Sequence, residues 1–181
     1  MNVIHVDTET IADAIPKIRA RDEVYLSGVI YTARDAAHKK LCAMLEKGET
    51  PPFPLQNAII YYAGPTPERP GQIIGSCGPT TSSRMDAFSP LLMAHGAIGM
   101  IGKGPRSKEV VDAIVRYRGI YFCAIGGAGA LAARAVKKLD VIAFPELGCE
   151  SVKRLVVEEL PVYCGIDCFG QTMFGTDGQK Q

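Results

Sequence analysis

The residues best suited to chemistry lie in one nine-residue stretch, from Gly78 to Asp86. It combines the hydroxyls of Thr80 and Thr81 with the guanidinium of Arg84. A planar guanidinium can bind two oxygens of a carboxylate or phosphate at once. Apolar residues follow at helical spacing, so we expect the stretch to begin a helix, where free N–H groups favour anions. The stretch therefore predicts an anion-binding turn.

An ordinary helix cap is the competing interpretation of this turn. Ser and Thr are common N-cap residues, so Thr80, Thr81 or Ser82 would accept a hydrogen bond from the helix backbone. Arg84 would then lie on the solvated face. Threonine is also a poor base, so a role in proton transfer requires nearby cations or a proton relay.

Two further cations, Arg34 and Lys103, also lie where a predicted strand or turn meets a helix. Such junctions often carry ligand-facing groups. Together with Arg84, they could hold both carboxylates of a small dicarboxylic acid. Their separation in sequence does not show that they are close in space, and a solvated surface charge is the competing interpretation of each.

The elements that must position these residues alternate along the chain as short apolar strands and helices. This alternation predicts a single compact domain with a layered α/β sheet. We expect strands at 23–32, 58–63, 97–101, 120–124, 140–144, 152–159 and 161–166, and helices at 37–47, 85–95, 107–116 and 129–137. Proline-rich connectors lie at 48–54 and 64–71, the second as a surface loop between two strands.

Composition bounds the class of protein. The chain has 181 residues, 47% of them hydrophobic and 22% charged, which is typical of a globular protein with a real core. Its 20 Lys and Arg against 19 Asp and Glu leave no bulk charge to bind nucleic acid. There is no leader pattern and no membrane-length apolar run, so we expect no membrane partner and a cytoplasmic protein. The six cysteines are expected to be reduced thiols.

Three other patterns invite functional interpretations that we do not favour. The Gly126-Gly127-Ala128-Gly129 run lacks the spacing of a dinucleotide-binding loop and is better explained as a tight strand-to-helix turn. The Cys164 and Cys168 pair has no second pair or nearby His, so it predicts no metal site. Two histidines and two acids are interpreted as packing or structural residues: His38, His95, Asp86 and Glu146.

The chain resembles the carboxy-terminal domain of class I, iron–sulfur fumarases and the β subunit of L(+)-tartrate dehydratase. The resemblance covers nearly the whole chain and rests on motifs that occur in the same order. They are Leu26-Ser27-Gly28, Thr32 to Lys39, Tyr61 to Pro65, the Gly78 to Asp86 stretch, Ala94-His95-Gly96, Gly102-Lys103-Gly104, Ile125-Gly126-Gly127 and Phe144 to Gly148.

The resemblance implies a swivelling β/β/α domain spanning residues 1–181 and a role for each candidate site residue. It implies that Thr80 lies near the carbon that loses a proton, and that Thr81 binds a carboxylate oxygen. Arg34, Arg84 and Lys103 would converge on the substrate. Ser82 and Ser83 depart from the family pattern, which commonly has Gly just before the Arg, so fine substrate choice is open.

The resemblance also implies half of a two-subunit hydro-lyase that interconverts fumarate and (S)-malate. Such enzymes use a [4Fe-4S] cluster whose open iron acts as a Lewis acid. None of the six cysteines matches a family ligand, so the cluster is expected on an α-type partner subunit in a hetero-oligomer. Two alternatives stay open: an L(+)-tartrate dehydratase β subunit and a non-catalytic anion-binding module.

Overall fold

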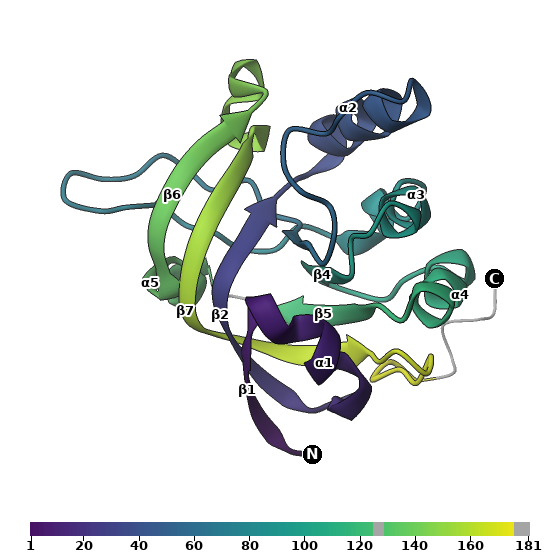
Figure 1. The fold of residues 1–181 in the computed structure, drawn as a ribbon. Coiled ribbons are helices and arrows are strands. Elements are labelled where there is room, and N and C mark those ends of the chain that lie inside the picture. Colours follow the sequence, from purple (N-terminus) through teal and green to yellow (C-terminus); the bar gives the residue numbers. More distant parts are fainter. Residues whose placement is uncertain (125–128, 176–181) are drawn as a thin grey trace.

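The strands form one sheet that curls until its long second strand meets its long last strand (Figure 1). The computed structural model describes residues 1–124 and 129–175. Its strands are β1 (Val3–Asp7), β2 (Glu23–Thr32), β3 (Ile59–Tyr61), β4 (Gly99–Gly102), β5 (Ile120–Ala124), β6 (Val136–Ala143) and β7 (Val152–Ile166). Their order is β1-β2-β3-β4-β5-β7-β6, and β7 also pairs with β2. The pairings therefore close β2, β3, β4, β5 and β7 into a ring.

The first five strands are parallel, whereas β7 runs antiparallel to its three neighbours β2, β5 and β6. Thr32 at the end of β2 pairs with Tyr61 at the end of β3, and Tyr61 pairs with Ile101 near the end of β4. Parallel strands in this register bring the residues that follow each of them to one edge of the sheet.

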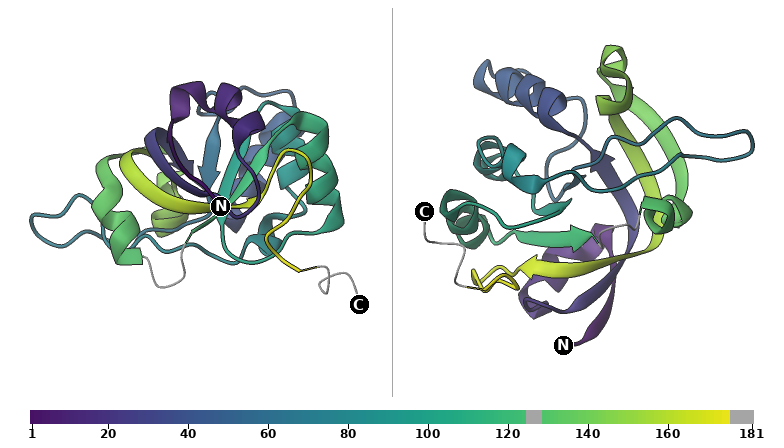
Figure 2. Two further views of the ribbon diagram at one scale, coloured as in Figure 1. Left: turned by 90° about the horizontal axis from the view of Figure 1, so that it is seen from below. Right: turned by 180° about the vertical axis from the view of Figure 1, so that it is seen from behind.

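Helices connect the parallel strands and cover them. The α-helices are α1 (Ile11–Ala14), α2 (Asp35–Glu46), α3 (Ser89–Ala94), α4 (Lys108–Tyr117) and α5 (Gly129–Ala135). Short 3-10 helices are η1 (Thr8–Thr10), η2 (Ile15–Lys17), η3 (Ser82–Met85) and η4 (Pro145–Glu150). Helices α2, α3 and α4 lie in a row along one side of the sheet in both the front and the rear view (Figures 1 and 2).

Two buried clusters hold the layers together, and alternation along the strands divides the residues between them. Ile59 and Tyr61 of β3 join a cluster that includes Ile11 of α1 and Ala132 of α5. Ile60 of β3 joins the second cluster, whose members include residues of α2, α3 and α4. Successive side chains of a strand point to opposite faces, so one short strand contributes to both cores.

The predicted layered α/β fold is confirmed, and β2 and β5 have the predicted bounds. The helix expected at 129–137 ends at Ala135, because Val136 already pairs with Val157 as the start of β6. The two strands expected at 152–159 and 161–166 are one strand, β7, which passes Glu159 at a φ of 52°. The predicted turn at Gly126 to Ala128 lies outside the described residues.

The proline-rich connector at 64–71 was expected to be a surface loop between two strands. In the structure it is part of a longer loop, and no strand follows it before β4. Residues 62–80 contain no helix or strand, and residues 64–76 project beyond the sheet (Figures 1 and 2). The two sides of the loop are joined where Thr66 N–H donates to the Ser76 carbonyl and Ser76 N–H donates to Thr66 Oγ1, at 2.8 Å. Ile73 remains 49% exposed, so this apolar position does not belong to a buried strand.

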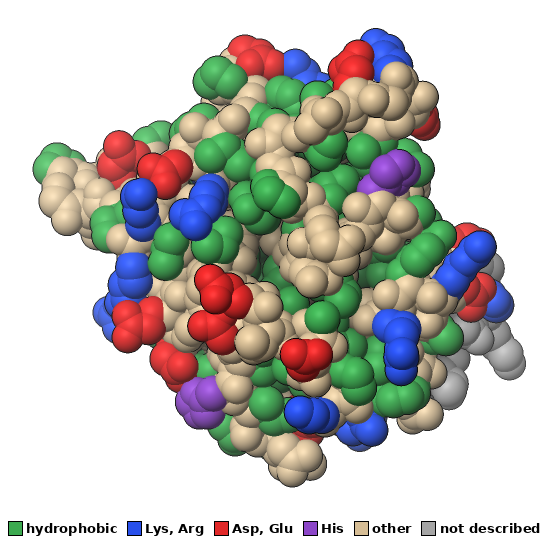
Figure 3. All heavy atoms as spheres, viewed as in Figure 1, with side chains coloured by type: hydrophobic (Ala, Val, Ile, Leu, Met, Phe, Trp, Pro, Cys, Tyr) green, Lys and Arg blue, Asp and Glu red, His purple; other side chains and the backbone are tan. Residues whose placement is uncertain are grey.

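Charges of both signs occur on the face of the molecule drawn in Figure 3. On the face shown in Figure 3, acidic and basic side chains are interspersed. No described helix combines the length and apolar character needed to cross a membrane.

Candidate active site

The candidate site is the edge of the sheet where β2, β3 and β4 end. Arg34 lies two residues beyond β2 and precedes α2, while Lys103 directly follows β4. Tyr62 follows β3 between them, and its carbonyl accepts a 2.7 Å hydrogen bond from the backbone N–H of Thr80. The segment that carries Thr80 therefore runs along this edge, next to both predicted cations.

Backbone contacts join the threonine turn to the lysine loop. Thr81 forms a parallel bridge with Lys103, and Ser82 N–H donates to the Lys103 carbonyl at 2.9 Å. In return, Lys103 N–H donates to Ser82 Oγ at 2.8 Å. A Cβ at Gly102 would lie 1.8 Å from that oxygen, so this contact requires glycine at position 102. Thr80, Thr81 and Lys103 are thus held at fixed spacing by short-range contacts.

Arg84 is tied to the element that Arg34 precedes. Its Nε donates to Asp35 Oδ1 at 3.0 Å, and Asp35 is the first residue of α2. The Arg84 side chain is 53% exposed. The structure therefore brings all five predicted site residues, on three separate loops, to one edge, where Thr81, Arg84 and Lys103 are exposed.

Unpaired polar atoms gather at this edge. Within the described residues, four buried side-chain atoms lack a hydrogen-bond partner: Arg34 Nε, Asp35 Oδ2, His38 Nε2 and Glu150 Oε1. Arg34 Nε lies 3.9 Å from Glu150 Oε1, too far for a hydrogen bond. Buried polar groups are normally paired, so such a concentration is typical of a site that binds a ligand or a partner.

The helix-cap interpretation of the turn is not supported. Thr81 occupies the N-cap position of η3, but its side chain makes no capping hydrogen bond. The prediction of one α-helix over 85–95 was wrong, because η3 ends at Met85 and α3 begins only at Ser89. The N–H of Ser82 is bonded to the Lys103 carbonyl, so this backbone donor is not free to bind an anion.

Arg106 is a buried cation behind the turn that sequence reasoning missed. Its side chain is fully buried, and its polar contacts include three with oxygen: Nε donates to Asp86 Oδ1 at 2.6 Å, and Nη2 donates to Ser89 Oγ at 2.7 Å and to Tyr62 Oη at 3.3 Å. The guanidinium also lies over the rings of Tyr62 and Tyr121, at 5.2 and 4.9 Å. Asp86 is therefore the structural partner that the sequence predicted, with a cation that the sequence did not identify.

The segment η4 covers Arg34 from the other side. Glu146 of η4 forms an ion pair with Lys40 of α2, in agreement with its predicted structural role. A Cβ at Gly64 would lie 3.1 Å from both Arg34 Cδ and the Cys149 carbonyl, so the loop, the guanidinium stem and η4 meet here. Behind them, the buried Lys153 ammonium donates to the Cys149 and Ser151 carbonyls at 3.0 and 3.1 Å.

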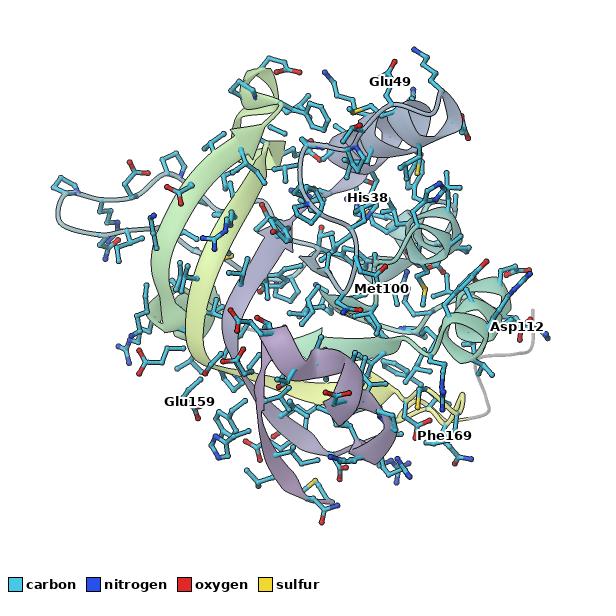
Figure 4. All side chains as sticks on the ribbon, in the orientation of Figure 1. His38, Glu49, Met100, Asp112, Glu159 and Phe169 are labelled. Carbon is cyan, nitrogen blue, oxygen red and sulfur yellow. The ribbon has the colours of Figure 1, made fainter. Side chains whose placement is uncertain are left out.

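His38 is a packing residue, as predicted, and it also supports the start of α2. Its Nδ1 lies 2.8 Å from the Arg34 carbonyl, and its ring packs edge-on against Tyr62. Figure 4 labels it between α2 and the sheet. Complete burial lowers the pKa of His38 to about 4, so the ring is neutral near pH 7. A neutral ring with Nδ1–H can donate to the Arg34 carbonyl. His95, in contrast, is exposed.

The thiols do not fit a cluster site. All six cysteines are free, and five are buried at scattered positions. Burial raises the pKa of Cys42 and Cys123 to about 11 and that of Cys77 to about 12, which keeps them as thiols rather than thiolate ligands. No group of His, Cys, Asp and Glu in the described part of the chain is arranged to hold a metal ion.

The fold and this edge define an α/β domain that presents cations and hydroxyls where parallel strands end. Comparison with known proteins identifies it further: residues 1–177 match the family model described as the fumarase C-terminus. The chain belongs to the fumarase C-terminal family. Relatives of this chain carry the names of hydro-lyases, fumarate hydratase and L(+)-tartrate dehydratase subunit beta.

The relatives fall into two sizes. Fumarate hydratase 2 of Leishmania major is 40% identical over 83% of this chain but only 27% of its own length. The anaerobic class I fumarate hydratase of Escherichia coli is 40% identical over 86% of this chain and 29% of its own length. A Methanocaldococcus jannaschii protein named as L(+)-tartrate dehydratase subunit beta is 38% identical over 92% of this chain and 88% of its own length. The chain thus spans under a third of those fumarate hydratases.

Proposed function

We propose that this chain is the β subunit of a two-subunit iron–sulfur hydro-lyase that interconverts fumarate and (S)-malate. One observation carries the proposal: Arg34, Thr80, Thr81, Arg84 and Lys103 lie at one edge of the sheet, where the buried Arg34 Nε has no hydrogen-bond partner among the described residues. Similarity to a tartrate dehydratase β subunit over most of both chains supports the two-subunit arrangement. In this proposal, residues 1–181 are one hydro-lyase domain that moves as a swivelling unit in a cytoplasmic hetero-oligomer.

The residues at the edge suit a substrate with two carboxylates. Arg84 offers a planar fork to one carboxylate, while Arg34 and Lys103 supply charge for the other. Loss of a proton next to a carboxylate builds negative charge on that carboxylate, and fixed cations stabilise it. The Thr81 hydroxyl binds a carboxylate oxygen in this arrangement.

Thr80 is the proposed catalytic residue. Its backbone is fixed by the hydrogen bond to the Tyr62 carbonyl, and its side chain is half-buried beside the cations. A threonine hydroxyl can transfer a proton only when neighbouring charge or a relay helps it. The [4Fe-4S] cluster is assigned to the α-type partner, because the thiols described here do not fit it.

L(+)-tartrate is the second candidate substrate, favoured by the relative of matching length. Its additional hydroxyl needs a polar contact, which either subunit could supply. A non-catalytic anion-binding module is the alternative outside the enzymes, and it predicts dicarboxylate binding without turnover.

The test is anaerobic purification of this chain alone and together with its α-type partner. We expect the lone chain to bind no iron and to be inactive, and the complex to hydrate fumarate. Faster turnover of tartrate than of fumarate or malate would identify tartrate as the substrate in place of fumarate. Stoichiometric iron with turnover by the lone chain would overturn the two-subunit proposal, and a loaded complex that binds dicarboxylates without turnover would favour the binding module.

A further inference from the structure

Arg106 is a charged side chain with no access to solvent or substrate, yet its partners lie directly beneath the proposed site. The side chain is 0% exposed, and its partner Asp86 is 15% exposed. Burying a cation is costly unless it is paired and hydrogen-bonded, and here every arm of the guanidinium has a partner. Its Nη1 contacts Met100 Sδ at 3.5 Å, in addition to the contacts with Asp86, Ser89 and Tyr62.

The first connection runs from Arg106 to Thr80. Tyr62 lies with its ring under the Arg106 guanidinium, and its hydroxyl is 2.9 Å from Ser89 Oγ, which Arg106 also contacts. The carbonyl of the same tyrosine accepts the backbone N–H of Thr80. A shift of Tyr62 would therefore move the anchor of Thr80.

The second connection runs from Arg106 to Lys103. The ring of Tyr121 lies on another side of the guanidinium, and its hydroxyl is 2.8 Å from both Ser82 Oγ and the Gly104 carbonyl. Ser82 Oγ in turn accepts the backbone N–H of Lys103. Tyr121 thus links the guanidinium to the contact that holds the lysine loop against the threonine turn.

The third connection joins the two loops directly. Asp86, at the end of the turn, accepts hydrogen bonds from Arg106 Nε and from the backbone N–H of Ser107, at 2.6 and 2.8 Å. Ser107 is the N-cap of α4, and its hydroxyl accepts from Val110 N–H. The carboxylate therefore fastens the turn of Thr80 and Arg84 to the start of α4.

We propose that Arg106 is a positioning residue that sets the spacing between the Thr80–Arg84 turn and the Lys103 loop. The kinetic part of this proposal rests on the proposed function, whereas the structural part does not. Arg106 is one group that contacts the anchors of both loops, and a planar guanidinium can satisfy them together. A lysine at this position would keep the charge and reach Asp86, but it would lose the simultaneous contacts with Ser89 and Tyr62.

The structural part is tested by amide hydrogen exchange on the full chain, comparing Arg106→Lys with the wild type. We expect exchange at the Ser82 and Lys103 amides to rise tenfold or more, with the amides of the β2 and β7 pairing unchanged. Arg116→Lys is the matched control, because Arg116 is an exposed arginine that lies over the Tyr117 ring at 5.5 Å. Unchanged exchange at Ser82 and Lys103, or an equal rise at all amides, would overturn the proposal.

The kinetic part is tested in the complex with the α-type partner. Misplacing reacting groups by about 1 Å can cost on the order of a hundredfold in rate. We expect Arg106→Lys to lower kcat tenfold or more per folded complex, and to lower it less than threefold in a Thr80→Val background, because groups that act as a unit are not additive. Equal factors in both backgrounds, or unchanged kcat with only a lower yield of folded protein, would overturn the positioning role. An inactive wild-type complex would refute the proposed function, and the exchange experiment would still decide the placement of the loops.

Discussion

The edge of the sheet and the Arg106 network lie next to each other but satisfy their polar groups in opposite ways. Arg106 is fully buried and its guanidinium nitrogens all have partners. At the edge, Arg34 Nε and Asp35 Oδ2 are buried without a partner in the described part of the chain, and Arg84 is half exposed. The two regions therefore contain similar charges with very different pairing.

The Arg106 network is therefore suited to holding the loops in place, and the edge is suited to binding a ligand. A buried network whose groups are all paired holds its segments in one arrangement. Of the unpaired atoms at the edge, Arg34 Nε is a donor that an anion can satisfy, whereas the carboxylate oxygens of Asp35 and Glu150 need a donor from a ligand or a partner. Substitutions at the edge should therefore mainly change binding and turnover, whereas the loss of a hydroxyl from the Arg106 network should mainly change stability.

The largest effect is expected from Thr80→Val at the edge. Turnover of the complex should fall by roughly a hundredfold or more, which is the usual contribution of a positioned acid–base group. Stability should change little, because the backbone hydrogen bond to the Tyr62 carbonyl remains in the variant. Thermal unfolding and anaerobic rates, corrected for cluster content, provide the measurement.

Thr80→Ser is the control for this variant, since it keeps the hydroxyl and should retain most activity. A loss of stability with full activity in Thr80→Val would instead give the Thr80 hydroxyl a purely structural role. That result would remove Thr80 from the proposed catalytic residues.

A pH-dependent loss of stability is expected from His38, which is buried against Tyr62 next to the edge. Its pKa is about 4 in the folded chain, against about 6.5 when exposed, so the unfolded chain takes up the proton first as the pH falls. The stabilising effect of the neutral ring is complete above pH 6.5 and is lost as the pH falls toward 4. Between pH 7 and pH 5 this should lower the free energy of unfolding by about 2 kcal/mol.

Urea unfolding at several pH values tests this, with His38→Asn as the comparison. The variant keeps an amide that can donate to the Arg34 carbonyl but does not titrate, so the difference in stability between the two proteins should shrink as the pH falls. Parallel pH profiles for the two proteins would contradict the buried, neutral histidine.

Arg84→Lys should weaken dicarboxylate binding by roughly 1–3 kcal/mol, because a point charge replaces a two-pronged fork. The fold should be unaffected, since the Arg84 side chain is 53% exposed. Calorimetric binding of succinate, as a dicarboxylate probe, and kinetics on the complex give the measurement. If both are unchanged, Arg84 is a surface residue and does not belong to the site.

The smallest effect is expected from Tyr121→Phe, which removes one hydroxyl from the Arg106 network. The lost contacts with Ser82 Oγ and the Gly104 carbonyl should cost about 1 kcal/mol of stability. Differential scanning calorimetry should show a lower Tm, with substrate affinity nearly unchanged. A large loss of substrate affinity without a lower Tm would mean that Tyr121 acts at the edge rather than in the Arg106 network.

The local pattern predicted that Arg34 and Lys103 lie where a strand or turn meets a helix, but it did not show that they are close in space. Only the resemblance implied that they converge. The backbone form of the turn was not predictable in this way. Ser82 N–H is bound by the carbonyl of Lys103, a contact between loops that no local pattern contains.

Arg106 shows most clearly what the sequence alone could not give. It lies between Pro105 and the N-cap Ser107, where a cation is normally solvated. Its burial depends on the rings of Tyr62, which directly follows β3, and of Tyr121 in β5, and these are distant in the sequence. Only the packing of the helices against the sheet brings these three residues together.

The closure of the sheet by β7 has a consequence for how the chain folds. β7 pairs with β2 and with β5, so the ring needs residues 152–166 before it can close. Contacts between segments so far apart in sequence are slow to form. Until β7 docks, β2 and β5 each present an unpaired strand edge, which is a surface prone to aggregation. A chain truncated before Val152 should therefore aggregate instead of folding into a smaller domain.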